Sequence, residues 1–397
     1  TFYVLSRQDH RDNIALFLYD FENNKYLEEV ASVDGLDIDD VWLNEARQVE
    51  RVSYTKHTTR FVFEDPVAQA HYDALVDGFG QDTLISLIDE SEISKRWLIR
   101  VSAPDRLPED YLYDLENKKL TFIGRQKSWF EDIKLAPMTV IDYTASDGTS
   151  LHGYLTGHPI KDGASPRPLI IMPHGGPEAR DRLQFNETVQ LLASYGYQVF
   201  QPNFRGSSGF GSSFARAGDR QWGKKMQTDI YDGIDHLISE GLATERNMCM
   251  VGGSYGGYAS FMGLIQQPER YKCGVAIAAP SDLLDILSWQ NRKSQDAQDY
   301  WTRHIGHPRR DRDAIKAVSP IELVDQIQAP LLIIHGEEDT VIPVRQSRNL
   351  KRALDKAGID FTYLELRKSN HTLRALSDER QEMEAILQFL EKHIPAD

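Results

Sequence analysis

The sequence predicts a two-part fold, in which an all-β segment over residues 1–135 precedes a mainly parallel sheet with helices on both faces over residues 136–397. Three observations support this prediction. The first third shows short strand-like runs between turn signals and lacks helical periodicity. Beyond it, buried strand-like runs alternate with helical patterns. The third observation is a glycine-rich turn at a strand-to-helix junction, GGSYG over residues 252–256.

The composition is that of a folded chain with an acidic surface. The 397 residues are 41% hydrophobic, which is enough for a large core and for two or three domains. The net charge is -15 and no Lys/Arg block appears, which argues against a nucleic-acid partner because phosphate binding needs a basic face. The longest apolar runs, such as residues 330–334, are far shorter than the roughly 18 residues of a membrane helix, so we expect no membrane span.

The two cysteines, Cys249 and Cys273, lie inside apolar strand-like segments. We therefore expect buried small hydrophobes rather than a disulfide framework. No signal-peptide pattern opens the chain, and its first residue is Thr1 rather than methionine. A soluble, cytoplasmic location is favoured, and a periplasmic one stays open because we interpret the chain as a processed product or a fragment.

Residues 1–135 contain strand-like segments and one internal repeat. The segments are residues 2–6, 13–30, 60–65, 83–89, 96–103 and 110–124. The run LYDFENNK from Leu18 matches LYDLENKK from Leu112 at an offset of 94 residues. Half that offset is close to the roughly 40 to 50 residues of a propeller blade, and the midpoint near residues 65–66 keeps a strand-then-turn pattern. We expect an incomplete β-propeller; the alternative is an irregular antiparallel sheet packed on the next domain.

A polar, proline-containing stretch over residues 125–137 marks the expected domain boundary. The pattern beyond it predicts a hairpin over residues 138–156 that turns at Asp147-Gly148. Strands are expected over residues 168–177 with their loop, 197–206, 248–251, 274–280, 330–336 and 361–366, and helices over 185–195, 229–240 and 377–393. Ligand sites in such sheets lie at the carboxyl ends of the strands, so we expect the chemistry just after each strand.

The turn at residues 252–256 has the G-x-S-x-G form of a nucleophile elbow. Small residues are needed two places before and after the serine, because its backbone is strained and larger side chains would collide there; Gly252 and Gly256 hold these places. The strain lifts the Ser254 hydroxyl to the top of the sheet, and the backbone N–H of Tyr255 can serve an oxyanion. The alternative is a plain glycine-rich turn, so the neighbouring strand ends must decide.

Two later strand ends carry residues that complete a catalytic set. Asp339 follows the strand over residues 330–336, and His371 follows the strand over residues 361–366. The order Ser254, Asp339, His371 is the one expected for a triad on an α/β-hydrolase sheet. His371 would act as general base and then general acid, and Asp339 would fix its tautomer. The rivals in the strand-end loop are His335, Glu337 and Glu338.

The loop HGGP over residues 174–177 follows another predicted strand. In α/β hydrolases this loop supplies the second oxyanion donor, and glycines let the backbone approach the tetrahedral oxygen. We expect the N–H of Gly176 to be that donor, with Gly175 in reserve. The alternative is a glycine turn between strand and helix.

Four motifs together carry a family resemblance. HGGP (174–177), PNFRGSSGFG (202–211), GGSYGGY (252–258) and HGEEDTVIPVRQS (335–347), with His371 following, resemble the catalytic domain of the prolyl oligopeptidase family of serine peptidases. The acylaminoacyl-peptidase and dipeptidyl-peptidase-like branches are the most similar, and the resemblance covers roughly residues 138–397. It implies a β-propeller lid in front of the hydrolase domain, and it implies that most of the propeller is absent from this chain.

The resemblance also bears on substrate choice. The segment YWTRHIG over residues 300–306 resembles the YTERYMG segment that lines the specificity pocket of dipeptidyl peptidases, but Thr302 and His304 depart from it, so a strict proline preference is not implied. The candidates for an apolar substrate pocket are Phe210, Trp289, Tyr300, Trp301 and Arg303. The alternative for the aromatic residues is ordinary core packing. Arg205 and Asp229 are interpreted as structural.

The favoured hypothesis is a serine peptidase that hydrolyses short peptides through an acyl-enzyme on Ser254, as an exopeptidase of acylaminoacyl- or dipeptidyl-peptidase type. A carboxylesterase is the alternative, because ester and amide hydrolysis share this chemistry. An inactive propeller-hydrolase scaffold that binds partners is the third reading. No Cys/His cluster with metal spacing occurs in the sequence, so no metal and no cofactor are expected. A homo-oligomer is left open.

Overall fold

A computed structural model of the chain describes residues 1–91, 93–159, 165–372 and 375–396. The chain divides into two compact units. The N-terminal unit contains Thr1–Val140, Arg182–Ser194 and Ser208–Phe214, and the C-terminal unit contains Ile141–Asp181, Tyr195–Ser207 and Ala215–Asp397.

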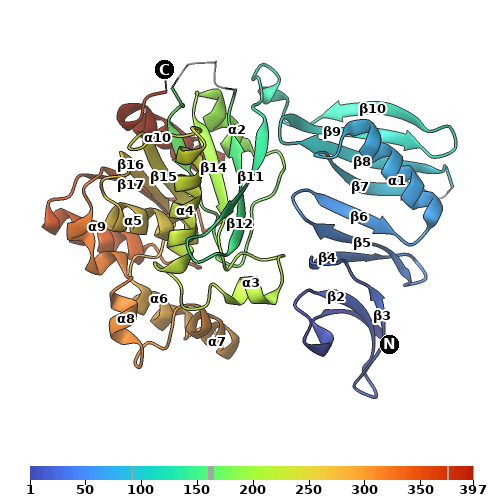
Figure 1. Cartoon of the computed structure of the whole chain (residues 1–397), viewed down its shortest axis with the longest axis horizontal. Helices are drawn as coiled ribbons and strands as arrows, with labels where there is room; N and C mark the ends of the chain where they lie inside the picture. Colours follow the sequence, from blue (N-terminus) through green and yellow to red (C-terminus); the bar gives the residue numbers. More distant parts are fainter. Residues whose placement is uncertain (92, 160–164, 373–374, 397) are drawn as a thin grey trace. The chain divides into compact units, whose positions relative to one another are not determined.

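The N-terminal unit is built from antiparallel sheets that follow one another along the chain (Figure 1). The first sheet holds β1 (Phe2–Ser6), β2 (Ala15–Asp20) and β3 (Lys25–Ala31), and the second holds β4 (Ile38–Leu43), β5 (Val49–Thr55) and β6 (Thr59–Phe63). The third holds β7 (Leu84–Ser91), β8 (Arg96–Ala103), β9 (Arg106–Asp114) and β10 (Lys119–Arg125) in consecutive order. Strands β4 and β5 were not expected from the sequence.

The sequence repeat folds into the same turn twice. Asp20 ends β2 and accepts backbone N–H groups from the second and third residues after it, and Asp114 does the same at the end of β9. The residue before the next strand has a positive φ in both turns, 50° at Asn24 and 51° at Lys118. An aspartate at the first turn position favours this local hydrogen bonding. The repeat therefore encodes two equivalent hairpins.

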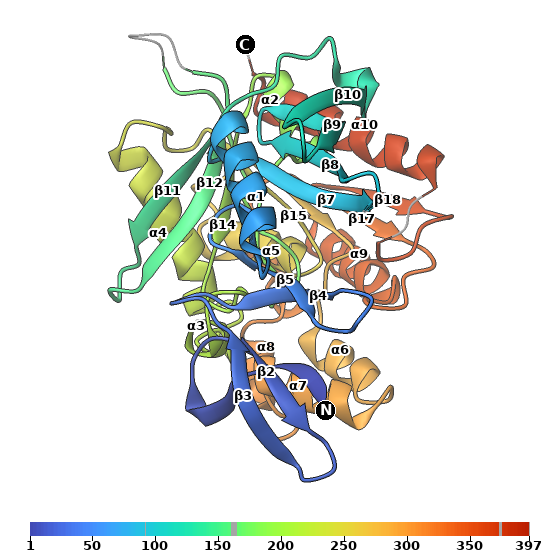
Figure 2. The ribbon, with the colours of Figure 1, turned by 90° about the vertical axis from the view of Figure 1, so that its right-hand side faces the viewer.

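Helix α1 (Pro66–Phe79) corrects our expectation that residues 1–135 lack helical periodicity. Its start signal was present in the sequence: Asp65 accepts hydrogen bonds from the N–H groups of residues 67 and 68, and Pro66 occupies the first turn. Tyr72, Leu75 and Val76 form its buried face, in a core cluster with residues such as Trp97. Figure 2 shows α1 beside the third sheet. The strand-then-turn pattern at residues 65–66 was a helix cap.

The C-terminal unit contains most of a mixed eight-stranded sheet, and this sheet is mainly parallel, as predicted. Its strands, in spatial order, are β11 (Met138–Thr144), β12 (Ser150–Thr156), β14 (Gln198–Asn203), β13 (Leu169–Ile171), β15 (Met248–Gly253), β16 (Cys273–Ile277), β17 (Leu331–Gly336) and β18 (Phe361–Leu366). Strands β11 and β12 form the expected hairpin, β12 pairs antiparallel with β14, and all pairs from β14 to β18 are parallel.

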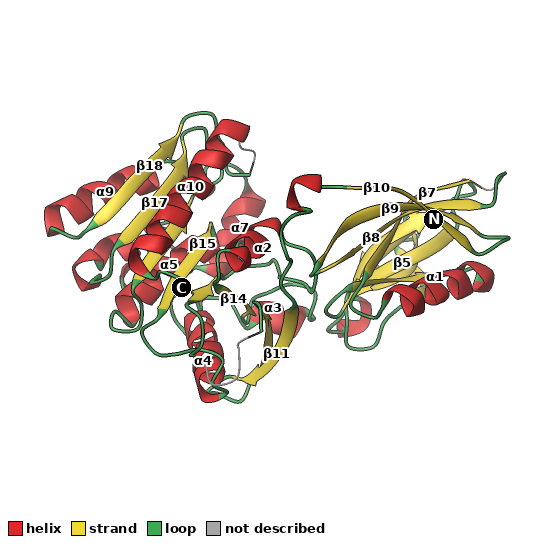
Figure 3. Ribbon diagram, turned by 90° about the horizontal axis from the view of Figure 1, so that it is seen from above, coloured by secondary structure: helices red, strands yellow, loops and turns green. Residues whose placement is uncertain are grey.

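Helices cover both faces of this sheet, as predicted. The helices that follow α1 in the chain are α2 (Glu187–Ser194), α3 (Ser212–Arg216), α4 (Lys225–Ser239), α5 (Tyr255–Gln266), α6 (Leu283–Gln290), α7 (Gln295–His304), α8 (Arg312–Lys316), α9 (Arg345–Ala357) and α10 (Leu376–His393). Helix α10 lies on one face, and α4, α5 and α9 lie on the other (Figure 3). Strands β13 and β17 are buried along their whole length because both faces are covered. No helix among the described residues is long and apolar enough to cross a membrane.

The strand order places the loops that matter for function. Strand β13 lies between β14 and β15, although β14 follows it in the chain, so the winding of the sheet reverses direction at β13. The loops after β13 and β15 therefore leave the same edge of the sheet side by side. Such a switch point is where open parallel sheets bind ligands.

Our expectation for the cysteines was wrong in one respect. Cys249 on β15 and Cys273 on β16 are fully buried, but they form a disulfide instead of staying separate. The register of the two parallel strands places them directly opposite each other. Cross-strand register was not visible in the sequence, because residues 249 and 273 belong to separate segments.

Candidate active site

Ser254 forms the junction between β15 and α5, where the backbone is held in an unusual conformation. Its φ and ψ are 55° and -120°. A Cβ atom at Gly256 would lie 2.0 Å from the carbonyl oxygen of Pro173, and one at Gly252 would lie 2.4 Å from the backbone of Gly256. Only glycine fits at these two positions, so the close packing holds the strained turn in place. The structure thus has the predicted strand, sharp turn and helix.

Ser254, His371 and Asp339 come together at the carboxyl edge of the sheet. The hydroxyl oxygen of Ser254 lies 3.1 Å from His371 Nε2, and His371 Nδ1 lies 2.7 Å from Asp339 Oδ2. An ionised carboxylate can only accept a hydrogen bond, so His371 Nδ1 carries the proton that it donates to Asp339. The other ring nitrogen, Nε2, is then free to accept the proton of Ser254. The three residues of the predicted catalytic set therefore form one hydrogen-bonded chain.

Asp339 is buried and surrounded by donors. Its Oδ1 accepts the N–H groups of Val341 and Ile342 at 2.8 and 2.9 Å, while Oδ2 faces His371 and His335. Burial by itself would raise the pKa of Asp339, but the hydrogen bonds from His335 and His371 outweigh it and hold this pKa well below its usual range. Asp339 is therefore ionised near neutral pH and faces the His371 ring as a negative charge.

The other candidates for these two roles, His335, Glu337 and Glu338, lie nearby and make different contacts. His335 is fully buried, and its Nε2 donates to the carbonyl of Ile342 at 2.8 Å while Nδ1 lies 2.6 Å from the Ser347 hydroxyl. His335 therefore supports the Asp339 turn and is not hydrogen bonded to Ser254. The side chains of Glu337 and Glu338 are exposed. Their backbone N–H groups instead bond to the segment that leads to His371.

The loop that carries His371 is anchored from two sides. The Ser369 hydroxyl and the Lys368 N–H both donate to Asp378 Oδ2, each at 2.9 Å, at the start of α10. On the other side, a Cβ at Gly336 would lie 2.5 Å from the Ser369 carbonyl oxygen. The end of β17 and the histidine loop thus pack backbone to backbone, which sets the distance between Asp339 and His371.

The predicted oxyanion loop lies directly against Ser254. A Cβ at Gly175 would lie 3.4 Å from the Ser254 Cβ. His174 holds this loop, since its Nδ1 donates to the Gly175 carbonyl at 2.8 Å and its Nε2 lies 2.9 Å from the Ser207 hydroxyl. Burial lowers the pKa of His174 to about 4, so the ring is neutral near pH 7. Tyr255 is the first residue of α5, so no preceding turn of this helix offers a carbonyl acceptor to its N–H.

Three of the predicted pocket residues lie on α7. Trp301 packs edge-on against Trp222 at 6.0 Å, and Trp222 packs against Tyr255 at 4.6 Å. Burial raises the pKa of Tyr300 to about 12, so its hydroxyl stays neutral. Arg303 is exposed and forms ion pairs, as described below. Tyr300 and Trp301 are thus connected to the serine elbow through aromatic packing.

The other two predicted pocket residues lie elsewhere. Trp289, on α6, has the charged groups of Arg345 and Lys293 over its ring, at 4.8 and 5.6 Å. Phe210 belongs to the N-terminal unit, where its ring packs edge-on against Phe214 at 5.4 Å. The part of Trp289 and Phe210 in a substrate pocket stays a prediction.

An ion cluster at the end of α7 was missed in the sequence. Glu178 Oε1 accepts from Arg303 Nη2 at 2.6 Å and lies 3.6 Å from His304 Nε2. Asp219 Oδ1 lies 3.5 Å from both Arg303 Nε and His304 Nδ1. The available signal was the position of Glu178 directly after the HGGP motif. Arg205 and Asp229, interpreted as structural, form a separate buried pair with a shortest distance of 2.7 Å.

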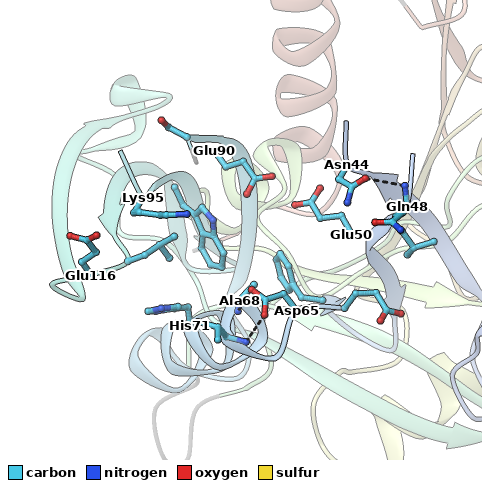
Figure 4. A pocket seen from close by; sticks show the side chains of 16 residues that line it. Asn44, Gln48, Glu50, Asp65, Ala68, His71, Glu90, Lys95 and Glu116 are labelled. Carbon is cyan, nitrogen blue, oxygen red and sulfur yellow. Dashed lines mark hydrogen bonds between the residues drawn. The ribbon is translucent and has the colours of Figure 1, made fainter. Parts of the chain in front are cut away.

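The N-terminal unit has an open pocket of about 820 Å³ of its own. Its lining combines the stacked rings of Phe63 and Trp97, 5.5 Å apart, with several acidic side chains and Lys95. Glu90 and Glu50 point toward one another across it (Figure 4). Partial desolvation in the pocket raises the pKa of Glu90 to about 7, and the facing Glu50 carboxylate adds to this shift. This pocket contains none of the residues that we predicted for the site.

The fold and this geometry are those of the α/β hydrolases with a serine, histidine and aspartate at the strand ends. A family model described as "Prolyl oligopeptidase family" matches residues 183–396, more than half of the chain. The chain therefore belongs to the prolyl oligopeptidase family, as the four motifs suggested.

Individual relatives agree with this assignment. The chain is 31% identical to dipeptidyl aminopeptidase BIII of Pseudoxanthomonas mexicana over 89% of its own length and 52% of the relative. It is 29% identical to dipeptidyl peptidase family member 6 of Caenorhabditis elegans over 78% of its length and 45% of the relative. The chain thus spans about half the length of these curated relatives.

Solved structures show the same fold. The acylaminoacyl peptidase of Pyrococcus horikoshii superimposes with a TM-score of 0.79 at 21% identity, over 97% of this chain and 60% of that one. The fold is an α/β hydrolase preceded by β-propeller blades, which confirms the predicted fold class.

Proposed function

We propose that the protein is a serine peptidase that cleaves short peptides through an acyl-enzyme on Ser254. The observation that carries the proposal is the hydrogen-bonded chain of Ser254, His371 and Asp339, at 3.1 and 2.7 Å, on an elbow whose glycines admit no side chain. Membership of the prolyl oligopeptidase family supports a peptide as the substrate.

The geometry suggests the following steps. Ser254 Oγ attacks the carbonyl carbon of the scissile peptide bond while His371 Nε2 takes its proton. The N–H groups of Tyr255 and Gly176 stabilise the oxygen that becomes negative; the N–H of Gly175 is the alternative to that of Gly176. His371 then gives the proton to the leaving amine, the C–N bond breaks, and the acyl group stays on Ser254. Water, activated by His371, releases the acyl product and restores the serine.

Asp339 would act through His371. It keeps the proton of the neutral ring on Nδ1 and stabilises the imidazolium that forms in each half reaction. No cofactor is needed for these steps, because every proton moves between Ser254, His371, substrate and water.

The type of peptidase is a finer part of the proposal. We propose an exopeptidase, because the relatives are named for dipeptidyl release and the similar structures include an acylaminoacyl peptidase. The aromatic residues Tyr300 and Trp301 are proposed to form a wall of the substrate pocket, since α7 packs through Trp222 on the elbow residue Tyr255.

The test compares initial rates on a matched panel: the p-nitroanilides of a free amino acid, an acetylated amino acid and a proline-containing dipeptide, and p-nitrophenyl butyrate. We expect turnover of at least one anilide, and a loss of about 10⁵-fold to 10⁶-fold in kcat for Ser254→Ala. The best anilide identifies the type of peptidase. Turnover of the ester alone would replace the peptidase proposal by an esterase, and no turnover of any substrate would contradict it.

A further inference from the structure

Helix α7 is linked to both predicted oxyanion donors, each time through one intermediate residue. One route is ionic: Arg303 donates to Glu178, which lies two residues after Gly176. The other is aromatic: Trp301 packs on Trp222, which packs on Tyr255. All of these residues belong to the C-terminal unit. A single helix is thus linked to the two backbone segments whose N–H groups would face the same oxygen.

The ionic route is short and tightly built. The backbone turns sharply between Gly176 and Glu178, since a Cβ at Gly176 would lie 2.8 Å from the Glu178 nitrogen. The Glu178 backbone nitrogen therefore lies directly against Gly176, so a shift of the Glu178 backbone would move Gly176 as well. Gly175, the next residue back, packs on Ser254. Only two peptide bonds separate Glu178 from Gly176, so a displacement of the Glu178 backbone would shift the oxyanion loop.

The far end of this contact is fixed as well. Arg303 bridges Glu178 and Asp219, at 2.6 and 3.5 Å, and His304 lies between the same two carboxylates with only 1% of its surface exposed. The Tyr300 ring packs over His304 at 4.2 Å. Hydrogen bonding to His304, and to a smaller extent the Arg303 charge, outweighs burial and holds the pKa of Glu178 below its usual value, so Glu178 is ionised near neutral pH and the ion pair persists.

We infer that Glu178 is a positioning residue of the oxyanion hole: its ion pair with Arg303 holds the Gly175-Gly176 segment at the distance from Ser254 and Tyr255 that the tetrahedral oxygen requires. The inference rests on the proposed function, in that it assigns a residue to the same acyl-transfer site. Glu178 acts through the backbone of Gly176 and touches no reacting atom. Its contribution should therefore appear in the transition state and not in ground-state binding of the substrate.

The first measurement is the kinetics of Glu178→Ala on the best anilide. We expect kcat to fall about 10-fold to 100-fold, because a displacement of about 1 Å costs up to that order, which is less than the complete loss of a donor. The KM should change by less than about threefold. Glu178→Gln should give an intermediate kcat, since an amide oxygen still accepts from Arg303 but carries no charge.

A matched control uses Glu322→Ala. Glu322 forms a comparable ion pair with Lys316 at 3.2 Å, in the segment around α8. This variant should keep the wild-type kcat. The pair is tested further by Arg303→Ala, which should reproduce the loss, while the double variant should lose little more than either single one.

A fluorophosphonate probe gives a readout that does not depend on peptide turnover. Ser254 Oγ displaces fluoride from phosphorus and its proton passes to His371, while the phosphoryl oxygen occupies the oxyanion position. We expect the labelling rate of Glu178→Ala to fall with kcat. Wild-type labelling without anilide turnover would contradict only the peptidase proposal, and the labelling ratio would still decide the positioning role.

Three results would overturn the inference. They are a Glu178→Ala variant with wild-type kcat and labelling rate, losses confined to KM, and a lower melting temperature with an unchanged kcat per folded molecule. Absence of Ser254 labelling in the wild type would overturn the inference together with the proposed function.

Discussion

Asp339 at the sheet edge and Glu90 in the N-terminal pocket are carboxyl groups in opposite electrostatic surroundings. Asp339 is the more deeply buried, yet its pKa is held well below the usual range, whereas the pKa of the more exposed Glu90 rises to about 7. The difference lies in the neighbours. Two imidazoles and two backbone N–H groups face Asp339, while a second carboxylate, Glu50, faces Glu90.

The comparison shows that burial alone does not set the charge of a carboxyl group. Desolvation disfavours the charged form at both positions, and donors reverse it only at Asp339. A carboxylate that must stay negative next to a histidine needs several fixed donors. Asp339 has them because its own loop turns back to offer the N–H groups of Val341 and Ile342.

The largest expected effect is on catalysis. Asp339→Asn replaces the acceptor of the His371 Nδ1 proton by an amide that can turn its NH₂ group toward the ring, which favours the wrong tautomer. We expect kcat on the best anilide to fall about 10⁴-fold. The matched variant Glu90→Gln should keep the wild-type kcat. A similar kcat for Asp339→Asn and wild type would contradict the role that we propose for Asp339.

A smaller effect is expected when the support of Asp339 is weakened. His335→Gln removes the imidazole that lies 3.3 Å from Asp339 Oδ2 and 2.8 Å from the Ile342 carbonyl. We expect kcat to fall about 10-fold to 100-fold, because a modest shift of Asp339 misaligns His371. Steady-state kinetics at a temperature where circular dichroism shows a folded variant would measure this. A kcat equal to that of the wild type would mean that the backbone donors suffice.

The smallest expected effect is on stability, and it has opposite signs for the two carboxyl groups. The raised pKa of Glu90 means that the folded protein binds more protons than the unfolded chain between its usual pKa of 4.5 and about 7, so the free energy of unfolding falls as the pH rises through this window. Because Glu90 is exposed and screened by water, we expect a loss of only about 1 kcal/mol. Asp339, with its lowered pKa, instead stabilises the fold above its usual pKa and loses this contribution on acidification.

Thermal unfolding of wild type and Glu90→Gln from about pH 5 to about pH 8 measures the Glu90 effect. Glu90→Gln should melt about 2 to 4 °C higher than wild type near pH 8, and the gain should shrink toward pH 5. Glu50→Gln should behave alike, since it removes the facing charge. A gain that is equal at both ends of the range would show that proton binding at Glu90 is not its cause.

Much of the fold was readable from the sequence because it depends on local patterns. Buried runs gave β13, β15 and β17, and the turn chemistry of the repeat gave the hairpins at Asp20 and Asp114. Helix α1 was missed although Asp65 and Pro66 form a regular helix start, because the repeat suggested a turn at this place. The disulfide was missed because it depends on the register between β15 and β16.

The sequence by itself determined which residue types stand at the strand ends: a serine between glycines, an acidic loop after β17 and a histidine after β18. Only the tertiary structure decided that Asp339 rather than Glu337 or Glu338 faces His371, and that Glu178 meets Arg303. Strand and turn patterns arise from neighbours in the chain, whereas hydrogen bonds and pKa shifts depend on distances of a few ångströms between groups more than thirty or a hundred residues apart. Those distances exist only once the sheet has brought its strand ends together.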